Sequence, residues 1–269
     1  MNALRDKALA IFREADNAAK RLREVERQRE IERATKRFAA LFRKQGSEFM
    51  ARFERLAGYF HEAAADRDLA DAFSEIFAVT REEAEDAMAR SLLGGLQLGY
   101  EAEASKFGIE VAFKMKPERA VAWANANAAT KVARVNTTTE DTIRRLVTKG
   151  IEEGKSYSEV ARQIKGGFDE FAGGQPQEHI RSRAELVAVQ ENAMAYEAGQ
   201  SQLVSEIEAV GIRMEKSIDG PDDDLTSGIC RDALAMGWVP MDTVFPGGEM
   251  TAPLHVACRH STAYRIAED

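Results

Sequence analysis

Cysteine and histidine side chains gather near the carboxyl end of this sequence of 269 residues. Thiolate and imidazole are ligands that zinc prefers, and a His-x-x-Cys spacing lets one tight turn bring two ligands together. Side chains two residues apart on a strand lie on the same face, and a residue from an earlier segment could complete a tetrahedral site. The sequence therefore predicts a structural zinc site formed by Cys230, His255, Cys258 and His260.

Two other interpretations of the cysteines remain open. The chain has only two, Cys230 and Cys258, so a disulfide-rich secreted scaffold is excluded. They could be buried thiols that pack as small apolar side chains, or they could form one disulfide outside a reducing cytoplasm. A stability argument favours zinc, because a subdomain of about 60 residues with few large apolar side chains buries too little surface to be stable alone, and a bound metal would stabilise it.

Catalytic chemistry has little support in the sequence. There is no nucleophile elbow, Walker lysine loop, zinc-protease helix motif or dinucleotide-binding fingerprint, and we predict no catalytic residue. The acidic residues Asp219, Asp222, Asp223 and Asp224 could hold a divalent cation, but they lack calcium-loop spacing and are more simply interpreted as a solvated loop. If zinc served a hydrolase, Glu249 and Asp219 would be the candidate bases.

The elements that must position these residues predict an α+β fold. The first ~165 residues show helical periodicity almost throughout, whereas short alternating segments follow Gly211. We expect a mostly α-helical N-terminal two-thirds with a small β-rich C-terminal subdomain. The predicted domains are a helical arm and partner-binding helical domain over 1–136, and a second domain over 137–269, with helices over 138–210 and the β subdomain over 211–269.

Capping residues predict where several helices begin. Ser47, after Gly46, is expected to cap a new helix. Thr80 and Glu83 match a capping box, and a further helix is predicted over 138–153. An aromatic stripe along the first helical region is typical of core packing, and it includes Phe38, Phe42, Phe49, Phe53 and Phe60.

Glycines and alternating residues give two further expectations. Glycines inside a helical stretch, at Gly94, Gly95 and Gly99, imply either a closely packed neighbouring helix or a bend, since each costs ~1 kcal/mol relative to alanine. In the β subdomain we expect short strands near 212–218, 238–240, 244–245 and 261–266, with an acidic loop over 219–229.

Charge is distributed unevenly along the chain. The whole sequence has a net charge of -8, yet residues 1–50 contain 13 Lys and Arg against 8 Asp and Glu. An acidic chain binds nucleic acid only locally, so the basic residues 20–44 are the candidate contact with DNA or an acidic protein surface. The simpler interpretation is a solvated helix face, because glutamates interleave with the basic residues and can pair with them.

The amino-terminal region gives no sign of membrane targeting. No segment reaches the ~18 apolar residues of a membrane span, and charges near the start leave no room for a signal peptide. We therefore expect the chain to be synthesised and folded in a cytoplasm. A weak heptad-like stripe permits self-association, and it consists of Leu4, Ile11, Ala18 and Val25.

Three blocks of sequence carry a family resemblance. The first is the segment RSRAELVAVQEN at 181–192, the second is an acidic stretch leading to Cys230 and then GWVP at 237–240, and the third is APLHVACRH at 252–260. In this order and spacing they resemble the phage Mu F-like head morphogenesis family, also described as minor head proteins. The third block departs from the usual P-P-x-H-P-x-C-R-C, since His260 stands where the last cysteine is expected.

The resemblance covers residues 138–266 and implies a structural component of a virion. Such a protein would associate with the portal protein, the major capsid protein or both, in the phage head or at the portal vertex, after synthesis in the host cytoplasm. It would act in head assembly and DNA delivery, and no enzymatic activity is implied. The alternatives are a virion-carried metal-dependent hydrolase or effector, and a component of a gene transfer particle.

Overall fold

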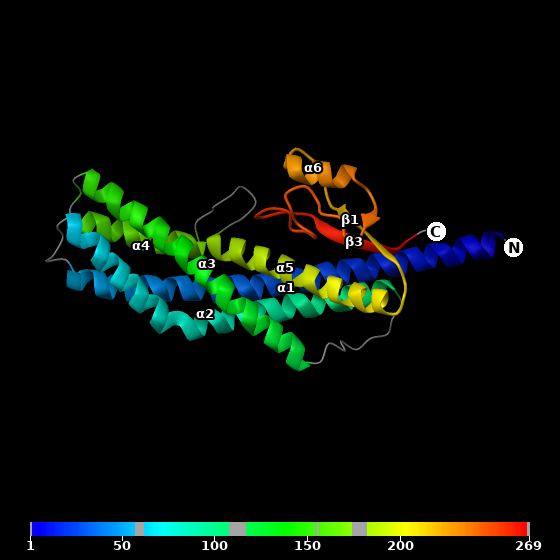
Figure 1. Ribbon diagram of the computed structural model, residues 1–269, viewed down its shortest axis with the longest axis horizontal. Coiled ribbons are helices and arrows are strands. Elements are labelled where there is room, and N and C mark those ends of the chain that lie inside the picture. Colours follow the sequence, from blue (N-terminus) through cyan, green and yellow to red (C-terminus); the bar gives the residue numbers. More distant parts are fainter. Residues whose placement is uncertain are drawn as a thin grey trace. The chain divides into compact units, whose positions relative to one another are not determined.

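The computed structural model describes the backbone of residues 2–56, 62–107, 117–153, 155, 157–173 and 182–267, and the α+β prediction is confirmed (Figure 1). No helix within the described residues is long and apolar enough to cross a membrane. The helices and strands of the described residues are α1 (Asn2–Leu56), α2 (Glu62–Lys106), α3 (Pro117–Glu152), α4 (Tyr157–Gly173), α5 (Arg183–Ala209), β1 (Met214–Asp219), α6 (Gly228–Ala235), β2 (Val239–Pro240) and β3 (Ser261–Ile266).

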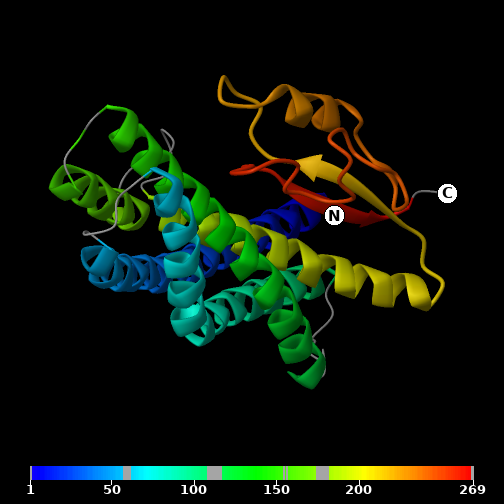
Figure 2. The same cartoon turned by 60° about the vertical axis from the view of Figure 1, so that its left-hand side comes forward.

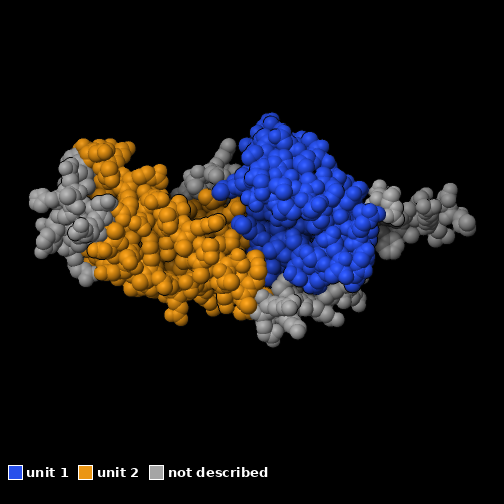
Figure 3. Space-filling view, in the orientation of Figure 1, with its two compact units in different colours: residues 1–32, 94–114, 192–269 blue, residues 33–93, 115–191 orange. Residues whose placement is uncertain are grey.

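The chain forms two compact units, each built from separate stretches of sequence (Figure 3). Unit 1 contains residues 1–32, 94–114 and 192–269, and unit 2 contains residues 33–93 and 115–191. The helices α1, α2 and α5 therefore contribute to both units. The domain boundary expected at 136/137 stays a prediction, and α3 runs through it without a break.

The core of unit 2 is aromatic, as the stripe on α1 predicts. Phe42 and Phe49 are fully buried, and the ring of Phe49 packs on Phe73 of α2 and Phe168 of α4 with centroids 4.9 and 5.8 Å apart. The predicted break at Gly46 is wrong. A Cβ atom at Gly46 would lie 2.8 Å from the Cβ of Phe168, so this glycine makes room for a neighbouring helix while α1 continues through it.

The hydroxyl side chains that suggested helix starts lie inside helices. Ser47 donates to the Arg43 carbonyl at 3.1 Å, and Thr80 donates to the Ile76 carbonyl at 2.8 Å. Thr138 likewise bonds one turn back along α3. A hydroxyl that bonds the carbonyl four residues earlier needs no chain break, so these three predicted starts are wrong.

From Glu30 onward, the basic segment 20–44 belongs to a packed core and does not project as a free arm. Glu30 is buried in unit 1, and Ala34, Phe38 and Phe42 are buried in unit 2. Among the heptad positions, Val25 is 45% exposed. The side chains of Leu4, Ile11, Ala18, Phe53 and Phe60 lie outside the part of the chain whose side chains are described.

Two glycines of unit 1 allow α2 and α5 to touch through their backbones. A Cβ atom at Gly99 would lie 1.9 Å from the Tyr196 carbonyl oxygen, and one at Gly199 would lie 2.0 Å from the Leu96 carbonyl oxygen. Since α2 is continuous from Glu62 to Lys106, close helix packing explains the glycines of this stretch.

The C-terminal part of unit 1 is a small antiparallel sheet in the order β2-β1-β3. The helix α6 packs on β1, and both ribbon views show it over one side of the sheet (Figures 1 and 2). A buried cluster fills the space between them, and it includes Ile218, Cys230, Phe245, Leu254 and Cys258.

Two expectations for this subdomain are wrong. Residues 244–245 form no strand. The Phe245 side chain is buried in the cluster, and its N–H donates to the Glu249 carbonyl across a turn. The acidic loop is shorter than predicted, because α6 begins at Gly228 with Ser227 as its N-cap, accepting from the Cys230 N–H. The predicted strand at 261–266 is confirmed.

A buried carboxyl group joins β3 to α5 within unit 1. Glu197 is 3% exposed, and its two carboxyl oxygens accept from the Thr262 N–H at 3.0 and 3.2 Å. Burial raises the pKa of Glu197 to about 8, although the bonds from Thr262 and the charge of Arg27 oppose the shift. The folded protein therefore keeps a proton on this carboxyl group near pH 7.

The substitution Glu197→Gln is expected to remove a loss of stability that the protein suffers as pH rises. The carboxyl pKa is 4.5 in a model peptide and about 8 in the fold. The folded state therefore binds more protons between these values, and stability falls by up to about 1.4 kcal/mol per pH unit. In urea unfolding, the free energy of unfolding of the glutamine variant should rise relative to that of the wild type from pH 5 to pH 8. A difference between the two that does not change with pH would contradict the assignment.

Candidate metal centre

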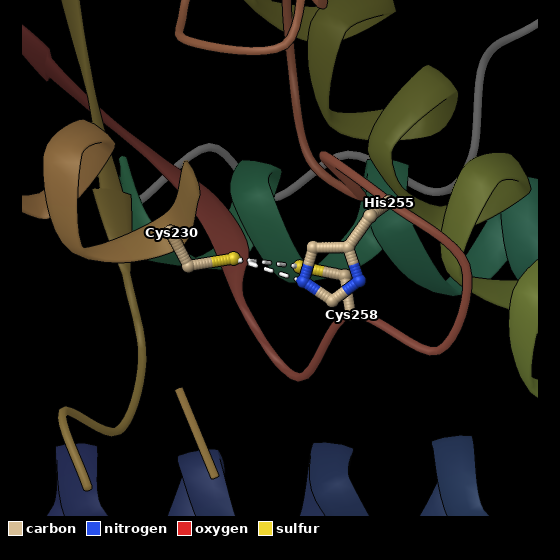
Figure 4. Close-up of side chains that lie close together, drawn as sticks. All are labelled: Cys230, His255 and Cys258. Atoms are coloured by element: carbon tan, nitrogen blue, oxygen red, sulfur yellow. Dashed lines mark hydrogen bonds between the residues drawn. The ribbon is translucent and has the colours of Figure 1, made fainter. Parts of the chain in front are cut away.

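Three of the four predicted ligands converge on one point of the C-terminal subdomain. Cys230 lies in the first turn of α6, and His255 and Cys258 lie in the loop before β3, with their side chains pointing toward one another (Figure 4). Cys230 Sγ lies 3.2 Å from His255 Nε2 and 3.7 Å from Cys258 Sγ. The three ligand atoms all lie within 4.8 Å of one another.

His260 lies beside this group without joining the three mutually close atoms. Its Nδ1 is 3.7 Å from Cys258 Sγ, and its side chain is buried directly before β3. A Cβ atom at Gly220 would lie 2.6 Å from His260 Cδ2, so a glycine is needed to admit the ring. The sequence prediction thus placed four residues together, of which three form the tight cluster and the fourth adjoins it.

Hydrogen bonds to backbone carbonyls fix the proton position on both imidazoles. His255 Nδ1 lies 2.8 Å from the Val256 carbonyl oxygen, and His260 Nε2 lies 2.8 Å from the Pro221 carbonyl oxygen. A carbonyl can only accept, so each of these nitrogens carries the hydrogen. The lone pairs of His255 Nε2 and His260 Nδ1 are then left facing the sulfur atoms, which is how metal-binding histidines are oriented.

The spacing of the two sulfur atoms suits a tetrahedral ion. Two sulfurs at the usual zinc–sulfur distance of about 2.3 Å are separated by roughly 3.8 Å across a tetrahedron, and the observed separation is 3.7 Å. A disulfide requires about 2.05 Å, so the structure contains two free thiols. Burial raises the pKa of the Cys230 thiol.

Local backbone features bring the ligands together. Ala257, between His255 and Cys258, has a positive φ of 58°, and the Cys258 N–H donates to the His255 carbonyl at 3.2 Å. This closes the tight turn that the His-x-x-Cys spacing predicts. On the other side, the Ser227 cap orients the first turn of α6 and thereby the Cys230 side chain.

The acidic loop braces the centre instead of forming a cation site. Both carboxylate oxygens of Asp223 bond Arg259, the residue between Cys258 and His260. The Arg259 guanidinium holds the pKa of the Asp223 carboxyl far below its usual range. Asp223 also accepts from the Leu225 N–H, so its oxygens are engaged within the protein.

Neither candidate base of a zinc hydrolase belongs to the converging cluster. Asp219 is exposed at the end of β1, and Glu249 is exposed in the turn that follows Phe245. The roles of Ser227 and Gly220 and the pairing of Asp223 with Arg259 were not predicted from the sequence. Of these, only Ser227 could have been found from the sequence, because a serine directly before an apolar-periodic segment indicates the start of a helix.

Comparison with known proteins bears on the carboxyl-terminal half of the chain. No curated protein and no solved structure matches the sequence. Residues 141–263 match the family described as Phage Mu protein F like protein. That stretch contains α4, α5, α6, the first two strands and all four candidate ligands. Residues 141–263 of this chain are therefore similar to the phage Mu protein F like family, which confirms the resemblance that the three sequence blocks indicated.

Proposed function

We propose that this chain is a minor head protein, a structural component of the virion that associates with the portal or the head interior. The family match supports a phage head-related protein. Portal association, a role in DNA delivery and the absence of catalysis are parts of the proposal. Synthesis in the host cytoplasm followed by incorporation into the head is the expected sequence of events.

The observation that carries the docking role is the apolar surface of the C-terminal part of unit 1. Its interior is closed by the buried cluster around Cys230 and Phe245, yet large apolar side chains remain on its outside. A contiguous exposed apolar patch marks a surface that binds another protein, and we infer that residues of this set form such a patch. They are Val210, Ile212, Leu225, Ile229, Met236, Trp238, Val244, Met250, Val256 and Ile266.

Charged substitutions on this surface should prevent association with the head. Val256 is 60% and Leu225 59% exposed, so aspartate at either position costs little folding energy but places a charge in an apolar interface. The full-length chain would be mixed with the portal oligomer of the same phage and co-purified by size exclusion. We expect Leu225→Asp with Val256→Asp to abolish co-elution.

Val79→Asp provides the matched control, because Val79 is 55% exposed but belongs to unit 2. It should co-elute with the portal as the wild type does. If the wild-type chain does not co-elute with the portal, or if the double variant does so unchanged, the proposed docking surface is wrong.

We further propose that the metal centre holds zinc through Cys230, His255, Cys258 and His260 and that its role is structural. The fit of the sulfur spacing and the orientation of both imidazoles support this assignment. Four protein ligands would fill a tetrahedral ion and leave no position for water or substrate, which is typical of structural zinc. The bound ion would cross-link α6 to the loop before β3, and it would supply no chemistry beyond that.

A further inference from the structure

A second site in unit 1 lies apart from the candidate ligands. It is a cavity of about 760 Å³ lined by α1, α2, α5 and β3. Pockets of roughly 300–1,000 Å³ accommodate organic ligands of drug or nucleotide size. None of the four candidate zinc ligands lines it, so the zinc centre makes no use of this space.

Two arginines from one face of α1 enter the lining. Arg23 and Arg27 are four residues apart and therefore lie one above the other on the helix. Arg23 donates to the neutral hydroxyl of Ser105 at 3.2 Å, and the Arg27 guanidinium lies over the Tyr196 ring at 4.8 Å. The buried Nε of Arg27 has no hydrogen-bond partner among the described residues.

The carboxylates around these arginines are engaged, exposed or protonated. Glu103 bonds Lys106 at 3.0 Å and accepts from Gln200 at 2.9 Å. Glu24 and Asp219 in the lining are exposed. Glu197, whose pKa is raised to about 8 by burial, does not neutralise Arg27 near pH 7. The two guanidinium groups thus keep their positive charge available to a ligand.

Other lining groups suit the remainder of a nucleotide. Gln200 is buried, and its Oε1 has no hydrogen-bond partner among the described residues, so it can accept from an exocyclic amine or a sugar hydroxyl. Trp238 is 40% exposed, with Arg265 placed 4.6 Å from its ring centroid. Aromatic and guanidinium planes are the surfaces on which nucleobases stack.

We propose that this cavity binds a nucleoside phosphate, with the phosphate on Arg23 and Arg27 and the base toward Trp238 and Gln200. Arginine pairs bind phosphate oxygens through directed, charge-assisted hydrogen bonds. The ligand is either a free mononucleotide or the end of a single DNA strand, because both present the same groups. This proposal does not rest on portal docking, although Trp238 lines the cavity and also belongs to the exposed apolar set of the docking proposal.

Isothermal titration of the full-length chain would test the site with four probes. These are deoxyadenosine monophosphate, deoxyadenosine, inorganic phosphate and a short single-stranded oligodeoxyadenylate. We expect the monophosphate to bind more tightly than either deoxyadenosine or inorganic phosphate. If the oligonucleotide binds more tightly than the monophosphate, the site is assigned to DNA. If the monophosphate binds more tightly, the site is assigned to a free nucleotide.

Variants then locate the binding. The double variant Arg23→Gln, Arg27→Gln should lower the affinity for the monophosphate by about tenfold or more, since charged hydrogen bonds are lost. Arg21→Gln, on the same helix but outside the lining, should not. Trp238→Leu should bring the affinity for the monophosphate down toward that for inorganic phosphate, which keeps the test valid if the double variant fails to fold. Absence of binding by the wild type, equal affinity for phosphate and monophosphate, or unchanged binding by Trp238→Leu overturns the proposal.

Discussion

Cys258→Ser is expected to abolish binding of the proposed zinc ion and to unfold the C-terminal subdomain while unit 2 stays folded. Cys258 is the central ligand of the cluster, near both Cys230 and His260. Structural zinc contributes about 10–16 kcal/mol to the folding of small zinc domains, which equals or exceeds the whole stability of a typical domain. The small apolar cluster around Phe245 cannot replace that contribution.

Hydrogen exchange with mass spectrometry measures this effect segment by segment. In Cys258→Ser, peptides covering β1 and β3 should lose protection, whereas peptides of α4 should keep it. Val256→Ser changes an exposed residue of the same turn and should behave as the wild type. Full protection of β1 in the metal-free Cys258→Ser protein would show that packing alone stabilises the subdomain.

The second large effect is expected at the contact between α2 and α5. Gly99→Ala places a methyl group 1.9 Å from the Tyr196 carbonyl oxygen, and Gly199→Ala places one 2.0 Å from the Leu96 carbonyl oxygen. The obstructing atoms are backbone atoms, which cannot rotate away, so the two helices must separate. We expect each change to destabilise the protein by about 3 kcal/mol or more, at or above the upper end of overpacking costs.

A control for this prediction is available within α4. A Cβ atom at Gly166 would have no neighbour within 4 Å, so Gly166→Ala should stabilise its helix by up to about 1 kcal/mol. Urea unfolding monitored by circular dichroism compares the three variants. A Gly99→Ala protein as stable as Gly166→Ala would mean that α2 and α5 do not touch through their backbones.

The candidate site could be predicted largely from the sequence, because its chemistry lies in residue types that are scarce in this chain. Only two cysteines exist, and one of them sits in a His-x-x-Cys turn. The structure brings together Cys230, His255 and Cys258, as that pattern predicts. What spacing could not provide are the carbonyl partners of the two imidazoles and the brace from Asp223 to Arg259, since these depend on loops that meet only after folding.

Fold class was predictable, but helix boundaries were not. Periodicity identifies helices through the faces they bury. It does not locate their ends, because a threonine can either cap a helix or lie inside one, as Thr80 and Thr138 do. Gly46 was misread because the contact that requires it comes from Phe168, far away in sequence. The helix α6 was missed because acidic loop residues precede it and it is only eight residues long.

Zinc K-edge X-ray absorption on the purified full-length chain tests most directly whether the four side chains form one closed metal centre. We predict one zinc ion per chain with two sulfur ligands near 2.3 Å and two nitrogen ligands near 2.0–2.1 Å. A chain that is folded throughout its C-terminal subdomain without zinc, or a zinc ion bound by fewer than four protein ligands, would contradict this prediction.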